Sequence, residues 1–215
     1  MKVITLATQK GGSGKSTVLV SCAVAALECG ERVYILEMDR QGTVSQWAKA
    51  REAETPDVDC IDGPRLEAAL SALKREGYSL VLIDTPGVDT PGTRPAMKAA
   101  DLCVLPVRPT GADVQGCLPT ARALVQMGVP FVFLLNQTQP QLLNSRAVET
   151  SSLLAHVGEV LEVSLASRTD YQDALASGLG VTEFDSKGKA AKEVRALWRE
   201  LARRLQVGGH HVEAA

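Results

Sequence analysis

A glycine-rich segment near the start of the chain has the residue types and spacing of a phosphate-binding loop. Residues 8–17 read TQKGGSGKST and lie between an apolar run at 2–7 and a helical pattern with an apolar face. Glycines let the backbone turn tightly, so successive N–H groups point at phosphate oxygens, and the following helix adds the positive end of its dipole. We expect Lys15 to reach the β- and γ-phosphates of a nucleotide and Ser16 to ligate Mg²⁺. The predicted nucleotide-binding residues of the loop are Lys10, Gly11, Gly12, Ser13, Gly14, Lys15, Ser16 and Thr17.

The elements that would position this loop alternate between strands and helices. Apolar runs at 2–7, 32–37, 58–61, 79–84, 102–107, 129–136 and 159–165 predict strands, most of them apolar at successive positions, as in a parallel sheet buried on both faces. Segments at 15–29, 43–54, 65–76, 113–127, 141–156 and 189–206 predict helices. This alternation predicts a doubly wound α/β fold, a mostly parallel sheet flanked by helices. We expect one domain over 1–206 and a disordered tail over 207–215.

Two predicted strands end in acidic residues that would lie near the loop. The run 33–39 contains Glu37 and Asp39 at its end, and the run 80–84 ends in Asp84, followed by Thr-Pro-Gly. Ligands of open α/β sheets bind at the carboxyl ends of the strands. We expect Asp84 to hold Mg²⁺ through a water molecule, because this ion dehydrates reluctantly. Either acid alone could be an ordinary strand-end residue, but the two together beside a phosphate loop favour a functional site.

Composition narrows the class of protein further. The 215 residues are 45% hydrophobic and 22% charged, which is typical of a globular chain with a sizeable core. A net charge of −2 means that nucleic-acid binding would need a local basic patch. The five scattered cysteines have no metal-ligand spacing and predict reduced core residues of a cytoplasmic protein. We expect neither a signal peptide nor a membrane span, which needs about 20 apolar residues.

The loop departs from the general phosphate-loop pattern in a way that resembles one family. The general pattern places a glycine at position 9, whereas this chain has Gln9 followed by Lys10. The string Lys-Gly-Gly-x-Gly-Lys-Ser-Thr is similar to the deviant Walker A loop of the ParA/MinD ATPases, and the small size resembles the short plasmid-type ParA proteins. The resemblance implies that Lys10 reaches the phosphates of the partner subunit in a nucleotide-sandwich dimer, as an arginine finger does. A solvated loop lysine is the alternative interpretation.

The resemblance also covers the first acidic strand end. In the family this end usually reads Asp-x-Asp-Pro-Gln and forms switch I. Asp39 and Gln41 match this pattern, while Glu37 and Arg40 replace the first aspartate and the proline. The resemblance implies that Asp39 orients the attacking water. The two replacements leave the rigidity of the switch and its rate of hydrolysis open.

Three further positions resemble family elements. Residues 85–90 resemble switch II, with Gly87 in it and Gly92 just after it permitting movement. Residues 105–109 followed by Asp113 resemble the segment that lines the nucleotide and the dimer interface. Asn136 stands at a strand end where the family commonly contacts adenine, although an asparagine that caps a turn fits the sequence nearly as well. The following Gln-Thr-Gln favours ATP, because a GTPase would have Asn-Lys-x-Asp here.

A basic stripe is predicted on the last helix. At about 100° per residue, Val194, Leu197, Trp198, Leu201 and Leu205 share one face, and basic residues share nearly the opposite one. Residues 183–191 look like a ParA segment that contacts DNA non-specifically, and a basic residue at 168 also has counterparts in related chains. The predicted DNA-binding residues are Arg168, Lys187, Lys189, Lys192, Arg195, Arg199 and Arg203. A plain surface helix is the alternative. The end of the chain lacks the pattern of an amphipathic membrane anchor, which favours the ParA branch and no membrane partner.

The phosphate loop and the acidic strand ends predict an ATPase that uses ATP and Mg²⁺, and the resemblance implies that it partitions DNA or positions a cargo. It would form a homodimer on ATP, bind non-specific DNA on the nucleoid, and be released when a ParB-like or cargo-adaptor protein stimulates its slow hydrolysis. The alternative is an ATP-dependent carboxylate-activating ligase on the same fold, such as the dethiobiotin or cobyrinate synthetases, for which the sequence shows no second substrate pocket. An iron–sulfur relative would need bridging or CxxC cysteines, a context that Cys103 and Cys117 lack.

Overall fold

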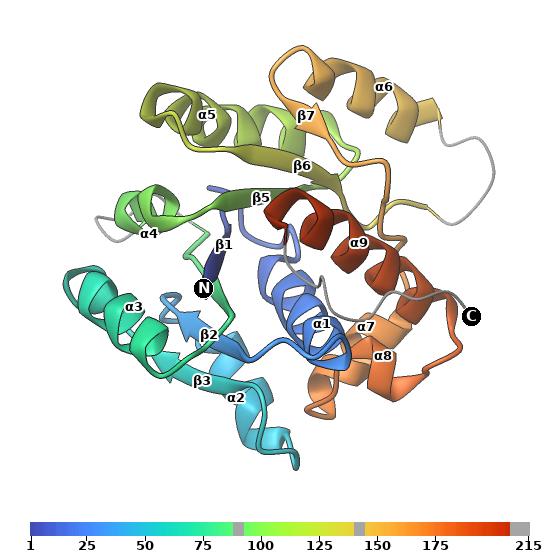
Figure 1. Ribbon diagram of the computed structural model, residues 1–215. Coiled ribbons are helices and arrows are strands. Elements are labelled where there is room, and N and C mark those ends of the chain that lie inside the picture. Colours follow the sequence, from blue (N-terminus) through green and yellow to red (C-terminus); the bar gives the residue numbers. More distant parts are fainter. Residues whose placement is uncertain (88–92, 140–144, 207–215) are drawn as a thin grey trace.

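A parallel sheet forms the centre of the molecule, as the computed structural model, which describes residues 1–87, 93–139 and 145–206, shows (Figure 1). Within these residues the sheet has seven strands in the order β3-β2-β4-β1-β5-β6-β7, and every neighbouring pair is parallel. The strands are β1 (Lys2–Leu6), β2 (Val33–Glu37), β3 (Asp57–Cys60), β4 (Leu80–Asp84), β5 (Leu102–Val107), β6 (Phe131–Leu135) and β7 (Glu159–Val160). The predicted doubly wound α/β fold is confirmed.

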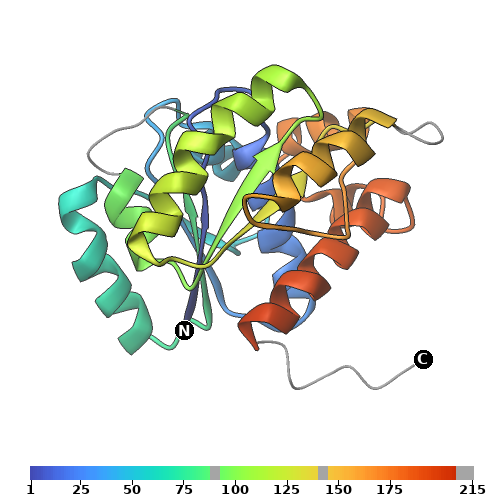
Figure 2. The same cartoon turned by 90° about the horizontal axis from the view of Figure 1, so that it is seen from above.

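Helices cover both faces of the sheet (Figures 1 and 2). The α1, α2, α7, α8 and α9 helices lie on one face, and α3, α4, α5 and α6 lie on the other. Their bounds are α1 (Lys15–Glu28), α2 (Thr43–Ala50), α3 (Leu66–Arg75), α4 (Thr93–Ala99), α5 (Gly111–Met127), α6 (Ser145–Ala155), α7 (Thr169–Ala176), α8 (Val181–Phe184) and α9 (Lys189–Leu205), with a 3₁₀ turn at Gly63–Arg65.

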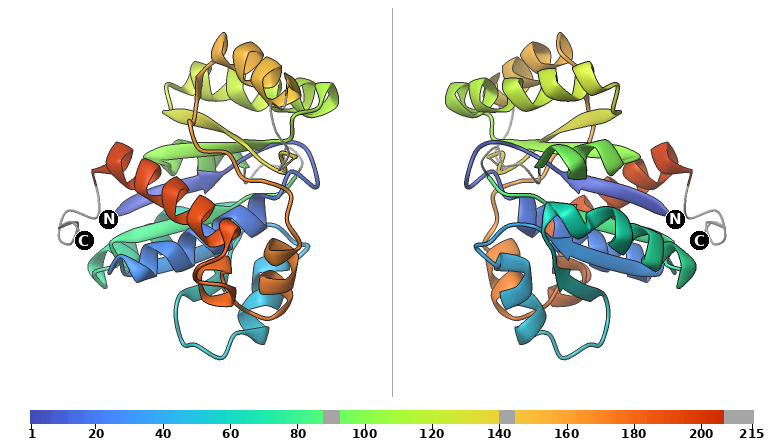
Figure 3. Two further views of the ribbon diagram at one scale, coloured as in Figure 1. Left: turned by 90° about the vertical axis from the view of Figure 1, so that its right-hand side faces the viewer. Right: turned by 90° about the vertical axis from the view of Figure 1, so that its left-hand side faces the viewer.

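The core follows from the two-residue period of the strands, which sends alternate side chains to opposite faces. In β1, Ile4 and Leu6 pack toward α1 and α9, whereas Val3 packs toward α3 and α4. The α1 helix is buried over most of its circumference, because α9 covers the side that faces away from the sheet. Figure 3 shows the start of β1 and the last turn of α9 at one end of the sheet, and the loop after β1 at the other.

Several elements differ from the sequence prediction. The strand expected at 159–165 is only two residues long, because β7 is an edge strand and only isolated backbone bonds, from Leu161 and Leu165 to β6, continue its course. The short helices α4, α7 and α8 were missed, since seven, eight and four residues are too few for a clear helical period. The expected tail at 207–215 and the start of the expected helix at 141–156 lie outside the described residues, and the division into one domain stays a prediction.

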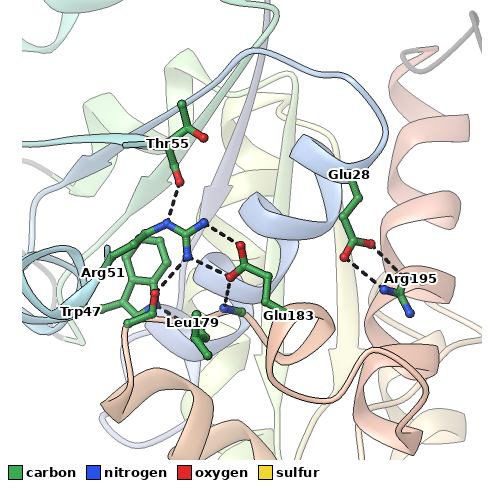
Figure 4. Close-up of polar contacts among 9 residues, drawn as sticks. Glu28, Trp47, Arg51, Thr55, Leu179, Glu183 and Arg195 are labelled. Atoms are coloured by element: carbon green, nitrogen blue, oxygen red, sulfur yellow. Dashed lines mark hydrogen bonds and ion pairs between the residues drawn. The ribbon is translucent and has the colours of Figure 1, made fainter. Parts of the chain in front are cut away.

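A buried arginine joins the end of α2 to the segment between α7 and α8 (Figure 4). The Arg51 side chain is 4% exposed, and its guanidinium donates two hydrogen bonds to the Glu183 carboxylate at 2.7 and 2.8 Å. It also donates to the carbonyl of Gly178 at 2.9 Å, while Trp47 Nε1 donates to the Leu179 carbonyl at 3.1 Å. These bonds fix α2, the helix that follows the predicted switch I, against α7 and α8.

We expect Arg51→Ala to lower the free energy of unfolding by about 2–3 kcal/mol, because it leaves Glu183 without its counter-charge and the Gly178 carbonyl without its donor. Urea unfolding of the nucleotide-free protein measures this loss. The matched control is Arg65→Ala, because the side chains of the Arg65–Asp62 pair are 67% and 65% exposed and should contribute nothing measurable. Equal losses in the two variants would contradict the prediction.

Candidate nucleotide-binding site

The loop after β1 adopts a backbone that its glycines allow. Gly12 and Gly14 have left-handed conformations with φ of +76° and +87°, and Gly14 caps the N-terminus of α1. A Cβ on Gly14 would lie 2.4 Å from Asn136 Nδ2, so this position excludes a side chain for lack of space as well. The first turn of α1 therefore begins directly at the loop, with its free N–H groups directed at the site.

A buried lysine begins α1. Lys15 is 7% exposed, and burial lowers the pKa of its ammonium group, while the charges of Asp84 and Asp39 act in the opposite direction. The charged form of a buried ammonium group is stabilised when an anionic ligand binds next to it. The arrangement supports the predicted contact between Lys15 and nucleotide phosphates.

The hydroxyl of the residue after Lys15 meets a carboxylate at the end of β4. Ser16 Oγ donates to Asp84 Oδ2 at 2.6 Å, and Asp84 is fully buried. Its other oxygen, Oδ1, is also buried and accepts no hydrogen bond from the residues that the structure describes. Burial raises the pKa of Asp84 to about 7, against the opposing effects of Ser16 and Lys15. Hard oxygen donors of this kind fit Mg²⁺, so the residues present match the predicted ion.

Hydrogen bonds of two acidic side chains, Glu37 and Asp39, hold the predicted switch I. Glu37 accepts backbone N–H bonds from Val44 at 2.8 Å and Ser45 at 3.0 Å, and so caps the N-terminus of α2. Asp39 accepts the N–H of Gln41 at 3.0 Å. From the sequence, Glu37 was recognised only as a replacement for the family's aspartate. The structure shows that its longer side chain reaches the N-terminus of α2. An acid buried at a strand end shortly before a helix was the signal that could have revealed it.

The start of the predicted switch II contacts the phosphate loop. Thr85 Oγ1 donates to the Leu6 carbonyl at 2.7 Å. A Cβ on Gly87 would lie 3.3 Å from the backbone of Gly11 and 3.5 Å from Lys15 Nζ, so only glycine fits here without displacing a neighbour. The rest of this predicted switch, residues 88–90, and Gly92 lie outside the described residues.

Asn136 supports the phosphate loop. Its Nδ2 donates to the Ser13 carbonyl at 2.7 Å, and its Oδ1 accepts the N–H of Gln137 at 2.9 Å. Gln137 Nε2 adds a bond to the Gly12 carbonyl at 3.2 Å. The sequence did not reveal this bracing role, since it links residues more than a hundred positions apart. The predicted adenine contact stays a prediction.

A small cavity lies between the start of α1, the end of β6 and α7. Its volume is about 120 Å³, and its lining includes Gly14, Thr17, Asn136, Ser167, Arg168 and Tyr171. Arg168 donates to Glu193 of α9 at 2.6 Å, and the other oxygen of Glu193 accepts from Tyr171 Oη at 3.2 Å. Arg168 thus lies at this cavity and pairs with Glu193, and its predicted contact with DNA stays a prediction.

Helix α9 presents three faces. The predicted apolar face is confirmed, since all five of its residues are at most 4% exposed. Glu193 and Glu200 form a second face toward residues 159–171, where Glu200 accepts the N–H groups of Glu162 and Val163 at 3.3 Å. On the third face, Arg195 pairs with Glu28 of α1 at 2.8 Å (Figure 4). Of the predicted DNA-binding set, Lys187, Lys189, Lys192, Arg199 and Arg203 are exposed.

The Lys10 side chain points away from the phosphate-binding centre of the loop and toward α5. Its Nζ is 3.2 Å from Asp113 Oδ2 on α5, and its side chain is 30% exposed. The structure thus places the two lysines of the loop differently, with Lys15 buried beside Asp84 and Lys10 held at the surface by α5.

Comparisons with known proteins identify the family of this chain. The model of the VirC1 protein family matches residues 1–202. The chain belongs to this family. It is 33% identical over 208 residues to the maintenance of carboxysome distribution protein A (McdA) of Gloeobacter kilaueensis, covering 95% of this chain and 94% of that protein. It is 27% identical to the chromosome-partitioning ATPase Soj of Thermus thermophilus, covering 94% of this chain and 96% of that one.

Solved structures show the same fold for this VirC1-family chain. MinD of Pyrococcus horikoshii in complex with Mg-ADP superposes with a TM-score of 0.79 at 17% identity, covering 98% of this chain and 99% of that one. McdA of Cyanothece superposes with a TM-score of 0.74 at 16% identity, over 95% and 99% of the two chains. The resemblance to the ParA/MinD ATPases is confirmed. An ATPase that uses ATP and Mg²⁺ is likewise confirmed at the level of the family.

Within residues 1–87, 93–139 and 145–206, no helix combines the length and the apolar character that crossing a bilayer requires.

Proposed function

We propose that this VirC1-family protein is an ATP-driven switch that positions or partitions a large cargo on DNA. ATP and Mg²⁺ bind, two subunits close face to face, and the dimer binds DNA without sequence preference. A ParB-like or cargo-adaptor protein then stimulates hydrolysis and releases the dimer. The observation that carries the ATPase part is the bond between Ser16 and Asp84 next to buried Lys15.

Each residue of the site has a task in this proposal. Lys15 neutralises phosphate charge within the subunit, and Lys10 does so across the dimer. Ser16 and Asp84 hold the metal, which when bound neutralises further phosphate charge. Asp39 orients the attacking water, and Asn136 braces the loop and faces the base. Catalysis of this kind is mostly positioning and charge stabilisation, so turnover before stimulation should be slow.

The relatives and the basic stripe support the positioning part. McdA acts in carboxysome distribution and Soj in chromosome partitioning, as their names state. Lys192, Arg199 and Arg203 are exposed on the third face of α9. Exposed cations on one helix face suit the phosphate backbone of DNA, which carries no sequence information for such contacts.

Co-sedimentation with non-specific DNA tests the proposal with ATP, with ADP and without nucleotide, over a salt series. We expect binding only with ATP and a steep loss of affinity with salt. The double variant Lys192→Glu/Arg199→Glu should bind at least about tenfold more weakly at moderate salt and reduce the slope of log affinity against log salt by about two. Lys15→Ala should neither dimerise nor bind DNA.

The matched control is Lys74→Glu/Arg75→Glu on α3, which makes the same charge change on the opposite face of the sheet. It should bind DNA as the unaltered protein does. Equal losses in the two double variants, or binding that ignores salt, would contradict the predicted surface. Hydrolysis without DNA binding at any salt would remove the DNA step and leave the ATPase.

A further inference from the structure

Two contacts with α5 fix the position of Lys10 in the single subunit. Its ammonium group lies 3.2 Å from Asp113 Oδ2, and its methylene chain runs along α5, where a Cβ on Gly116 would be 3.3 Å from Lys10 Cδ. The contact therefore has two parts, a charge pair at the tip and a glycine that makes room for the stem. Neither part involves the loop's own phosphate-binding interior.

The carboxylate that holds Lys10 is itself firmly fixed. Asp113 is 4% exposed, its Oδ1 accepts from Arg108 Nε at 3.0 Å, and its Oδ2 accepts from Thr110 Oγ1. Its backbone N–H returns a bond to Thr110 Oγ1, so the first turn of α5 orients the side chain. Burial acts to raise the pKa of Asp113, but the bonds from Thr110, Arg108 and Lys10 outweigh it and lower the pKa. The anion is thus a prepared partner for the Lys10 ammonium.

We propose that Asp113 is a positioning residue that holds Lys10 on its own subunit until ATP-driven dimerisation offers the phosphates of the partner subunit. This inference rests on the proposed function for one point, that Lys10 acts across a dimer. The ion pair then competes with dimerisation, because Lys10 must leave Asp113 before it can reach the partner. Asp113 thereby sets the protein concentration at which the switch closes.

The first test uses the nucleotide-free protein and does not depend on the proposed function. A double-mutant cycle of Lys10→Gln and Asp113→Asn is followed by urea unfolding. We expect the two changes to be coupled by about threefold or more in the unfolding equilibrium constant, as befits a contacting, partly buried pair. Purely additive effects would show that the pair does not hold Lys10 and would overturn the inference.

The second test measures ATP-dependent dimerisation. The dimer fraction is followed by light scattering over a protein concentration series, with Mg²⁺ and a non-hydrolysable ATP analogue. Asp113→Asn should lower the concentration of half-dimerisation about three- to tenfold, because it frees Lys10. Damage to the fold would raise this concentration, so a tighter dimer cannot be a structural side effect.

Two more variants sharpen the second test. Gly116→Ala crowds the stem of Lys10 while replacing glycine by a better helix former, so it should fold well and shift dimerisation in the same direction as Asp113→Asn. Asp101→Asn is the matched control, since Asp101 pairs with Lys2 in a half-exposed contact away from the loop, and it should change nothing.

The outcomes separate the inference from the proposed function. If the unaltered protein does not dimerise with the analogue, the proposed function fails, while the unfolding cycle still decides whether Asp113 holds Lys10. If it dimerises but Asp113→Asn and Gly116→Ala dimerise equally well or less well, the inference is overturned and the proposed function stands.

Discussion

Replacing Gly14 by alanine is expected to weaken nucleotide binding at least about a hundredfold, equivalent to about 3 kcal/mol. Two costs combine at this residue. Its φ of +87° is strained for any residue with a side chain, and the new Cβ would meet Asn136 Nδ2 at 2.4 Å. Asn136 would have to release the Ser13 carbonyl, so the loop would lose its brace as well as its backbone geometry.

Calorimetric titration of the variant with an ATP analogue and Mg²⁺ measures this effect. The matched control is Gly11→Ala, because a Cβ on Gly11 has nothing within 4 Å and its φ lies outside the left-handed range. This control should keep its affinity within a few fold of the unaltered protein. Similar losses at positions 11 and 14 would show that the loop requires glycines for the ligand's sake alone and would contradict the role of Asn136.

A second substitution, Asp84→Asn, is expected to stop the reaction and stabilise the fold. Hydrolysis should fall about a hundredfold or more, because the carboxylate expected to hold Mg²⁺ is lost. The nucleotide-free protein should gain about 2–4 kcal/mol in free energy of unfolding at pH 8, because an amide avoids the cost of a buried, unsatisfied negative charge.

The pH dependence of this gain follows from the raised pKa of Asp84, about 7 in the folded protein. Below about pH 4 the carboxyl is protonated in both states and costs nothing. Between about pH 4 and 7 the unfolded chain loses the proton while the folded chain keeps it, so stability falls as pH rises, and the loss is complete above the folded pKa. The gain from Asp84→Asn should therefore be small at pH 4.5 and full at pH 8.

Urea unfolding of the variant and the unaltered protein at pH 4.5 and pH 8 measures the gain in free energy of unfolding at each pH. Asp39→Asn is the control, since it changes a partly exposed carboxylate of the same site and should lower hydrolysis without stabilising the fold at pH 8. If Asp84→Asn were no more stable than the unaltered protein at pH 8, the prediction that the buried Asp84 charge destabilises the fold would be wrong.

Features that depend on short spacings or on a regular period could be predicted from the sequence. The phosphate loop, the acids at Asp84 and just after β2 at Asp39, and the apolar face of α9 all depend on short spacings. The parallel sheet follows from apolar runs buried on both faces. The function of Asp39 stays a prediction from family resemblance. The structure adds that Asp84 and Ser16, which lie 68 positions apart, share a hydrogen bond.

Pairings between distant side chains could not be predicted. Glu37 was noticed only as a departure from a family pattern, and its capping of α2 depends on how the chain returns after switch I. Arg168 was added to the DNA-binding set because related chains carry a basic residue there, and nothing in the sequence indicated its hydrogen bond to Glu193. Asp113 was placed near the dimer interface by resemblance, but its contact with Lys10 depends on the packing of α5.

The three faces of α9 have a thermodynamic consequence. One face carries Glu193, which reaches the cavity beside the phosphate loop through Arg168, and another exposes Lys192 and Arg199. Linkage between two binding events is reciprocal, so if the first changes the affinity for the second, the second changes the affinity for the first by the same factor. In the proposed function ATP raises the affinity for DNA, and DNA must then raise the affinity for ATP by the same factor. If the proposed DNA binding holds, DNA would act on this protein as an effector of its nucleotide site.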